Sequence, residues 1–144
     1  MGDGMLAIWN AVALEHDGVF NRWYTHEHVP ERLAVPGFLR GRRYVDVRAG
    51  GSDLRRYMTF YETDDLSVLG SPAYLDRLNS PTELTARVLP TLVEVVRACC
   101  SVVLSDGLGI GGHLGSLRFL HEQARLSTVV YEWLARGGTS ILLQ

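Results

Sequence analysis

"RRYMTFYET", residues 55–63, is the stretch of the sequence whose alternation most clearly predicts a β-strand. Tyr57, Thr59 and Tyr61 fall on one face and Met58 and Phe60 on the other, because successive side chains of a strand point to opposite sides of the sheet. Residues 38–47 alternate in the same way, and the polar, glycine-rich residues 48–53 separate the two runs. The two segments therefore predict a pair of neighbouring strands.

Upstream of this pair, residues 5–14 form a short apolar run that predicts a buried strand. The segment that follows is predicted to be helical, with Asp17 as its N-cap. Pro30 is expected to kink or end the helix, and Pro36 with Gly37 predicts a turn. One side of this helix carries side chains that recur at helical spacing: Phe20, Trp23, Tyr24, Glu27 and Glu31.

Downstream, residues 65–94 predict interrupted helices. Ser71–Pro72 and Ser80–Pro81 each have the pattern of an N-cap followed by proline at the first helical position. Residues 95–105 predict another strand. The resulting order β-α-β-β-α-β is typical of a ferredoxin-like α+β fold.

Residues 106–144 predict a second, shorter set of elements. Residues 106–112 are expected to be a linker, residues 113–120 a strand, residues 121–136 a helix and residues 137–144 a final strand. We therefore divide the chain into a ferredoxin-like unit (residues 1–105), a linker (106–112) and a truncated second repeat (113–144). We expect this repeat to pack on the same sheet.

Composition limits the kind of protein this is. The chain has 144 residues, 47% of them hydrophobic, and a net charge of −2, which gives no electrostatic case for binding nucleic acid or an anionic membrane. All fourteen basic residues are arginine, so lysine Schiff-base chemistry is excluded. No apolar run approaches the roughly 20 residues that span a bilayer. The adjacent Cys99 and Cys100 are expected to be buried free thiols, which favours a cytoplasmic location.

Four stretches together resemble a known family: "FNRWYTHEHVPERLAVPGFLRGRRY", "RRYMTFYET", "SPAYLDRLNSP" and "RVLPTLVEVVR". Their order and spacing are similar to the dimeric α/β-barrel superfamily, in its EthD-like branch and uncharacterised relatives, over residues 5–105. The resemblance implies a homodimer in which two ferredoxin-like sheets enclose a cavity. Relatives include isomerases, cyclases, cofactor-independent monooxygenases and haem enzymes, so the resemblance does not choose an activity.

His28 is the candidate catalytic residue, because it matches the His-x-Pro position of that family. An imidazole has a pKa near 6.5, so His28 is well suited to act as a general acid or base at the mouth of the cavity. An equally weighted interpretation is that His28 caps the broken end of the helix by bonding a free carbonyl. His26 lies about 160° round a regular helix from His28, so a shared metal ion is not expected and His26 is predicted to be exposed.

The candidate substrate-binding residues are Trp23, Arg42, Tyr44, Tyr57 and Tyr61. Trp23 is also simply explained as a core residue. The apolar Met58 and Phe60 face suits the helices, so the face with Tyr57 and Tyr61 is expected to line the cavity and to be buried in a homodimer. On the neighbouring strand, Arg42 and Tyr44 alternate in the same way and are expected to line the same cavity. A polar dimer interface without a ligand explains the same pattern.

Two functions remain open from the sequence. The first is an enzyme that works without a cofactor or metal, an isomerase, cyclase, decarboxylase or monooxygenase acting on a small aromatic or polyketide-like molecule. The second is a ligand-binding or structural dimer without catalysis. Whether the chain is an enzyme at all is not decided by these residues.

Overall fold

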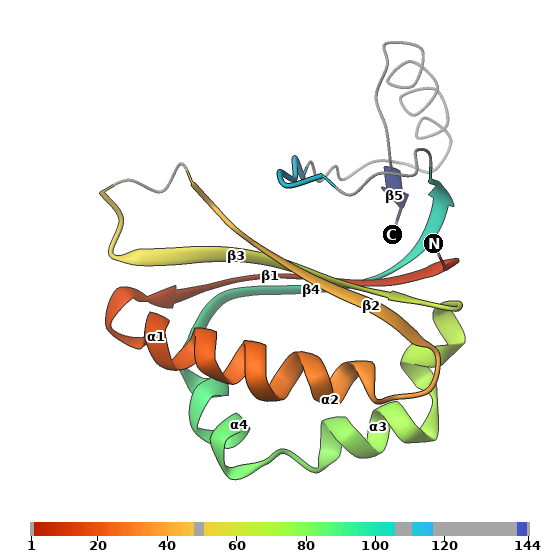
Figure 1. The fold of residues 1–144 in the computed structure, drawn as a ribbon, viewed down its shortest axis with the longest axis horizontal. Coiled ribbons are helices and arrows are strands. Elements are labelled where there is room, and N and C mark those ends of the chain that lie inside the picture. The colour runs from red at the N-terminus through yellow and green to blue at the C-terminus, as the bar shows by residue number, and fades with distance from the viewer. Residues whose placement is uncertain (1, 48–50, 106–110, 117–140, 144) are drawn as a thin grey trace.

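The computed structural model describes residues 2–47, 51–105, 111–116 and 141–143. Its centre is an antiparallel sheet with strand order β2-β3-β1-β4-β5. The first four strands in this order, with two helical connections, form the ferredoxin-like α+β fold that the sequence predicts. Figure 1 shows the helices together on one face of the sheet.

The elements have the following bounds. The strands are β1 (Gly4–Ala13), β2 (Phe38–Val45), β3 (Leu54–Thr63), β4 (Leu92–Leu104) and β5 (Ile141–Leu143). The helices are α1 (Leu14–Trp23), α2 (Val29–Leu33), α3 (Pro72–Asn79) and α4 (Glu83–Val88). Three further helical turns are a π-helix, η1 (Tyr24–His28), and two 3₁₀ turns, η2 (Leu66–Gly70) and η3 (Leu89–Thr91).

The first helix begins earlier than predicted, and Asp17 is not its N-cap. α1 starts at Leu14 directly after β1, and the capping position, Ala13, makes no side-chain hydrogen bond. The Leu14 amide instead donates to the Asp53 carbonyl at 3.1 Å. A residue distant in sequence thus satisfies one of the free amides that a cap would otherwise bond.

The sequence predicts that the helix either kinks or ends at Pro30, and in the structure it does not end there. α1, η1 and α2 follow one another without a break from Leu14 to Leu33. The π-helix at Tyr24–His28 comes immediately before the proline turn, and the Val29 amide bonds the Tyr24 carbonyl five residues back. π-Helical turns are rare in proteins, and those that occur are often found at functional sites. The side chains of Tyr24–His28 are therefore candidates for a functional role.

The caps of the later helices agree in part with the sequence. Ser71 accepts a hydrogen bond from the Tyr74 amide at 3.3 Å, as predicted for α3. α4 is capped by Thr82 and not by Ser80. The predicted turn after α2 is present, with Gly37 at φ +89°, a conformation that favours glycine.

The faces of β3 are the reverse of those predicted. Tyr57 and Tyr61 pack with the helix residues Phe20 and Trp23 in one buried cluster, so the face with the tyrosines is covered by helices of the same chain. Met58 and Phe60 lie on the other face. The prediction was wrong because both faces are apolar enough to pack against helices, and alternation alone does not distinguish them.

The face of the sheet opposite the helices, which we call the open face, has its own apolar cluster. Its members are Met5, Ala7, Phe60, Ala98 and Cys100, with Trp9, Tyr44, Met58 and Val102 packed against them. Residues 111–116 lie over this face in Figure 1. Two contacts hold them there, from the Trp9 indole to Ser116 Oγ at 3.3 Å and from the Tyr44 hydroxyl to the Gly111 carbonyl at 3.4 Å.

The tail is described only in part. β5 pairs antiparallel with β4, so the chain does add a strand to the sheet near its end, as predicted. Residues 113–116 are not a strand, and the rest of the predicted strand and the predicted helix lie outside the described residues. Cys99 is exposed and not buried as expected, whereas Cys100 is buried, and both are free thiols.

Within the described ranges, no helix is long and apolar enough to cross a membrane.

Candidate functional site

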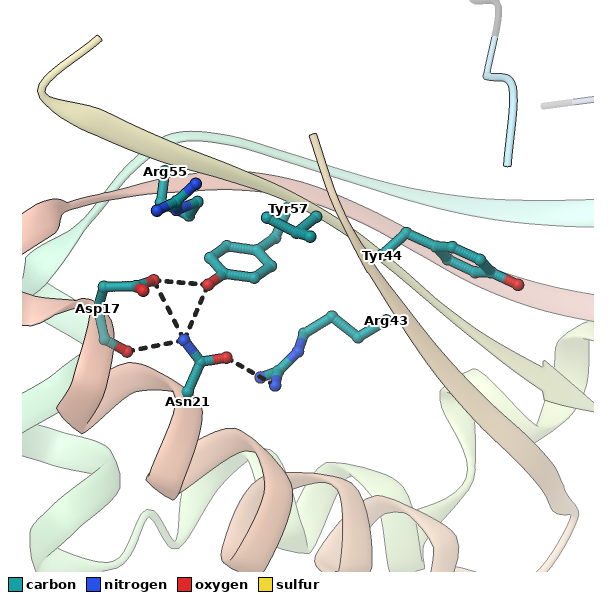
Figure 2. A pocket seen from close by; sticks show the side chains of 7 residues that line it. Asp17, Asn21, Arg43, Tyr44, Arg55 and Tyr57 are labelled. Atoms are coloured by element: carbon teal, nitrogen blue, oxygen red, sulfur yellow. Dashed lines mark hydrogen bonds between the residues drawn. The ribbon is translucent and has the colours of Figure 1, made fainter. Parts of the chain in front are cut away.

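An open pocket of about 370 Å³ lies where α1 meets the ends of β2 and β3. We call it the outer pocket. It is lined by Asp17, Asn21, Arg43, Tyr44, Val45, Arg55 and Tyr57. Tyr44 borders it but directs its ring away, as Figure 2 shows. A volume of this size is in the range of small-molecule sites.

Hydrogen bonds fix the polar groups of the outer pocket. The Tyr57 hydroxyl donates to Asp17 Oδ1 at 2.5 Å, and Asn21 Nδ2 donates to the Tyr57 oxygen at 2.8 Å (Figure 2). Asn21 Oδ1 in turn accepts from Arg43 Nη2 at 2.8 Å. Burial raises the pKa of Tyr57, and the hydrogen bond to Asp17 raises it further. Tyr57 is therefore a neutral hydrogen-bond donor at neutral pH.

Arg43 forms the inner wall of this pocket. Its guanidinium carbon lies 4.7 Å from the centre of the Tyr24 ring, 5.3 Å from that of Tyr57 and 5.5 Å from that of Phe20. Three aromatic faces thus hold the cation in place. Through Tyr24, Arg43 connects the outer pocket to a second group of polar residues deeper in the protein.

This second group, which we call the inner polar cluster, lies between the sheet and the helix α1–η1–α2. Its members are Asn10, Tyr24, His28, Arg32, Thr59 and Tyr61. Tyr24, His28 and Arg32 are four residues apart along the helix, and Asn10, Thr59 and Tyr61 are on the helix-facing side of β1 and β3. The centres of the His28 and Tyr61 rings are 6.4 Å apart.

The inner polar cluster contains an unusual number of unpaired hydrogen-bonding atoms. Asn10 is 3% exposed, Arg32 5%, and Thr59 and Tyr61 are fully buried. No residue in the described part of the chain hydrogen-bonds to the Asn10 side-chain amide, Arg32 Nη1 or His28 Nδ1. The buried Thr59 and Tyr61 hydroxyls have the Tyr24 hydroxyl as a polar neighbour. Native proteins pair most such groups, and each unpaired one costs about 1–3 kcal/mol of stability. So many in one place mark the cluster as a candidate site.

His28 is half-buried and points inward. Its ring centre lies 4.4 Å from that of Trp23 and 5.0 Å from that of Tyr24. Burial, together with the nearby positive charge of Arg32, lowers the pKa of His28 to about 3. The imidazole is therefore neutral at neutral pH, which fits a hydrogen-bonding role better than proton donation. Helix capping is not its role, because the helix continues to Leu33.

The two tyrosines of the cluster are also neutral. Burial raises the pKa of Tyr61, and the adjacent Tyr24 raises it further. Burial likewise raises the pKa of Tyr24, although the Thr59 and Tyr61 hydroxyls and Arg43 partly offset this. Both phenols keep their protons and so can donate hydrogen bonds to an oxygen atom of a bound molecule.

A network of hydrogen bonds joins the π-helix to α4. Glu27 accepts hydrogen bonds from the hydroxyls of Thr82 and Thr85, the latter at 3.0 Å. Thr85 Oγ1 also accepts from the Trp23 indole at 2.9 Å. Trp23 directly precedes Tyr24, and Glu27 directly precedes His28. These bonds therefore fix the segment that carries two members of the inner polar cluster.

The structure separates the predicted site residues into two groups. Trp23, His28, Tyr57 and Tyr61 all lie on the helix side of the sheet, whereas Arg42 and Tyr44 lie on the open face, where Tyr44 stacks on Phe60 at 6.0 Å. These residues therefore do not form one site as expected. β2 places Arg43, and not Arg42, toward the tyrosines. His26 is exposed, as predicted.

The site residues that sequence reasoning missed include Asn10, Arg32 and Arg43. Each had a signal. Asn10 interrupts the apolar run of β1 on the side of Leu6 and Val12, and Arg32 continues the four-residue spacing of Tyr24 and His28. Arg43 shares the side of β2 that faces Tyr57, once the faces of β3 are known.

Comparison with known proteins identifies no family. No protein-family model and no curated protein matches the chain. Among solved structures, a mutant of SnoaB, described as a cofactor-independent oxygenase from Streptomyces nogalater, is similar with a TM-score of 0.44 and 15% identity. The match covers 72% of this chain and 97% of the SnoaB chain. The ferredoxin-like fold of this chain is defined by its own strand order.

Proposed function

We propose that this protein binds a small aromatic or polyketide-like molecule between its helices and its sheet. The inner polar cluster is the observation that carries this proposal, because its unpaired donors and acceptors match the oxygen atoms of such a ligand. The surrounding rings of Trp23, Tyr24 and Tyr61 favour a planar molecule. The outer pocket lies on the other side of Arg43 from this cluster.

If the protein is an enzyme, it is a cofactor-independent isomerase, cyclase, decarboxylase or monooxygenase. His28 is then the residue that exchanges a hydrogen bond with the reacting group, as a neutral imidazole, and Tyr61 is the donor that positions the substrate. The burial of His28 beside Arg32 favours the alternative, a binding protein without catalysis, because this environment lowers the pKa of the imidazole to about 3 and makes it a weak base.

A binding experiment on the wild-type chain and an Asn10→Leu variant tests the proposal. We expect saturable binding of 2-naphthol or 1,4-naphthoquinone by isothermal titration calorimetry. Asn10→Leu should weaken it roughly tenfold and raise the free energy of unfolding by about 1–2 kcal/mol, because it removes two unpaired buried atoms with little change of volume.

The matched control is Asn79→Leu, at an exposed asparagine on α3. This change should leave ligand affinity unaltered and shift stability by less than about 0.5 kcal/mol. The proposal is contradicted if the wild-type chain binds neither probe, or if Asn10→Leu binds as well as the wild type.

We also propose that the chain forms a homodimer, as relatives of the dimeric α/β-barrel type do. The open face, and not the face with Tyr57 and Tyr61, is the interface that we propose, because its apolar cluster includes the partly exposed Met58. Residues 111–116, which contact Trp9 and Tyr44, lie at the same face. Membership of the EthD-like branch and a cytoplasmic location are part of the same proposal and rest on the sequence resemblance.

Sedimentation velocity at micromolar concentration should give the mass of a dimer, and Met58→Glu should shift it toward the monomer, since a carboxylate would be buried in an apolar interface. Leu66→Glu, at an exposed position on η2, is the control and should remain dimeric. A wild-type monomer at this concentration would exclude the proposed interface.

A further inference from the structure

Arg32 is a buried cation that has no counter-ion among the residues that the structure describes. It lies on α2, is 5% exposed, and its Nη1 atom has no hydrogen-bond partner in the described part of the chain. Glu31, the adjacent acid, is directed to Arg77 on α3, with 4.0 Å between the charged atoms. No carboxylate within the described ranges forms an ion pair with Arg32. A buried charge without a partner is strongly unfavourable, so this arrangement requires an explanation.

The immediate surroundings of Arg32 are neutral or positive. Its guanidinium carbon lies 5.7 Å from the centre of the Tyr74 ring. Arg97 lies over the same ring at 5.9 Å and donates to the Tyr74 hydroxyl at 2.9 Å. On the other side Arg32 is close enough to His28 and Tyr61 for its charge to act on both. The cluster therefore has a positive potential that none of its own members neutralises.

We infer that the ligand of the inner polar cluster is an organic anion, an aromatic carboxylate, whose charged oxygen is bound by Arg32. A guanidinium is suited to planar oxyanions, and hydrogen bonds to an ionised group are stronger than those between neutral groups. The Tyr61 and Thr59 hydroxyls, which lie beside the Tyr24 hydroxyl, would donate to the other oxygen atoms of the ligand in place of that contact. This inference rests on the proposed function, and it names the class of ligand for that same site.

The experiment compares 2-naphthoate with 2-naphthol near neutral pH, where the first is an anion and the second is neutral. By calorimetry, the wild-type chain should bind 2-naphthoate at least about tenfold more tightly. Arg32→Met, of similar length without charge, should lose this preference, and without ligand its melting temperature should be unchanged or higher, because an unpaired buried charge has been removed. Arg22→Met, at an exposed arginine on α1, is the matched control and should keep the preference.

Equal binding of the two probes by the wild type, or a preference that survives Arg32→Met, would overturn the inference. A large fall in melting temperature with the preference intact would give Arg32 a packing role against Tyr74 instead. If Arg32→Met does not fold, Arg32→Gln, which keeps the polar group and removes the charge, provides the same comparison. Failure of both probes to bind the wild type contradicts the proposed function itself, whereas equal binding contradicts only the preference for an anion.

Discussion

Trp23→Ala is expected to lower the free energy of unfolding by about 3–5 kcal/mol, the range for removing a buried tryptophan. The side chain is 1% exposed, its ring packs against Tyr24 at 5.2 Å and His28 at 4.4 Å, and its indole N–H bonds Thr85 Oγ1 at 2.9 Å. The change therefore leaves a large cavity and removes the hydrogen bond that the Thr85 hydroxyl accepts, although this hydroxyl still donates to Glu27. Chemical denaturation followed by circular dichroism measures the effect.

Trp23→Phe separates the two contributions. It keeps an aromatic ring in the core but removes the hydrogen bond to Thr85, so a smaller loss of about 1–3 kcal/mol is expected. Trp23 was a candidate for substrate binding and for packing, and this pair of variants measures how much of its role is packing. A loss of under about 1 kcal/mol for Trp23→Ala would show that the residue is not part of the core.

Acid is expected to destabilise the protein through His28. The folded pKa is about 3, whereas the unfolded chain has the ordinary value of 6.5, so between these values the unfolded state binds a proton that the folded state does not. Stability should therefore fall as the pH drops below about 6.5, by up to about 1.4 kcal/mol per pH unit. The loss of stability that is due to His28 should reach about 4 kcal/mol near pH 3, and above about pH 7 His28 should cause no loss.

Urea denaturation at a series of pH values measures this effect as the difference between the wild type and His28→Gln, which does not titrate. Carboxylates that titrate in the same range contribute equally to both chains and cancel in the difference. His26→Gln, at the exposed histidine two residues away, is the matched control and should keep the pH dependence of the wild type. Parallel curves for the wild type and His28→Gln would show that His28 is accessible and titrates normally.

The polar side chains of the inner polar cluster lower the stability of the protein, as is common at functional sites. Arg32 and Asn10 each place polar atoms in the core without a hydrogen-bond partner among the described residues, and either residue could be replaced by an apolar side chain of similar size. Proteins commonly accept such losses where binding or catalysis needs the group. The two variants at these positions therefore test function and stability together, and the two effects should have opposite signs.

The sequence by itself determined the order of the elements and the ferredoxin-like topology. Three local patterns carried this information: the alternation in residues 55–63, the helical spacing after residue 14 and the Ser71 cap. Each depends only on residues that are close in sequence, because the repeat of a strand or a helix follows from the local backbone geometry. They also identified Phe20, Trp23 and Tyr24 as the buried side of the first helix. These features needed no knowledge of which segments meet in space.

Only the tertiary structure decided which face of β3 meets the helices, and with it the composition of the site. Both faces are apolar, so the choice depends on the rings that α1 and η1 bring to Tyr57 and Tyr61, and this contact places Arg43 inside and Arg42 outside. The pKa of His28 follows from the same packing, because burial and the nearby Arg32 determine it. The start of α1 could not be predicted from the sequence either. The Leu14 amide donates a hydrogen bond to the Asp53 carbonyl, and these two residues come together only in the folded chain.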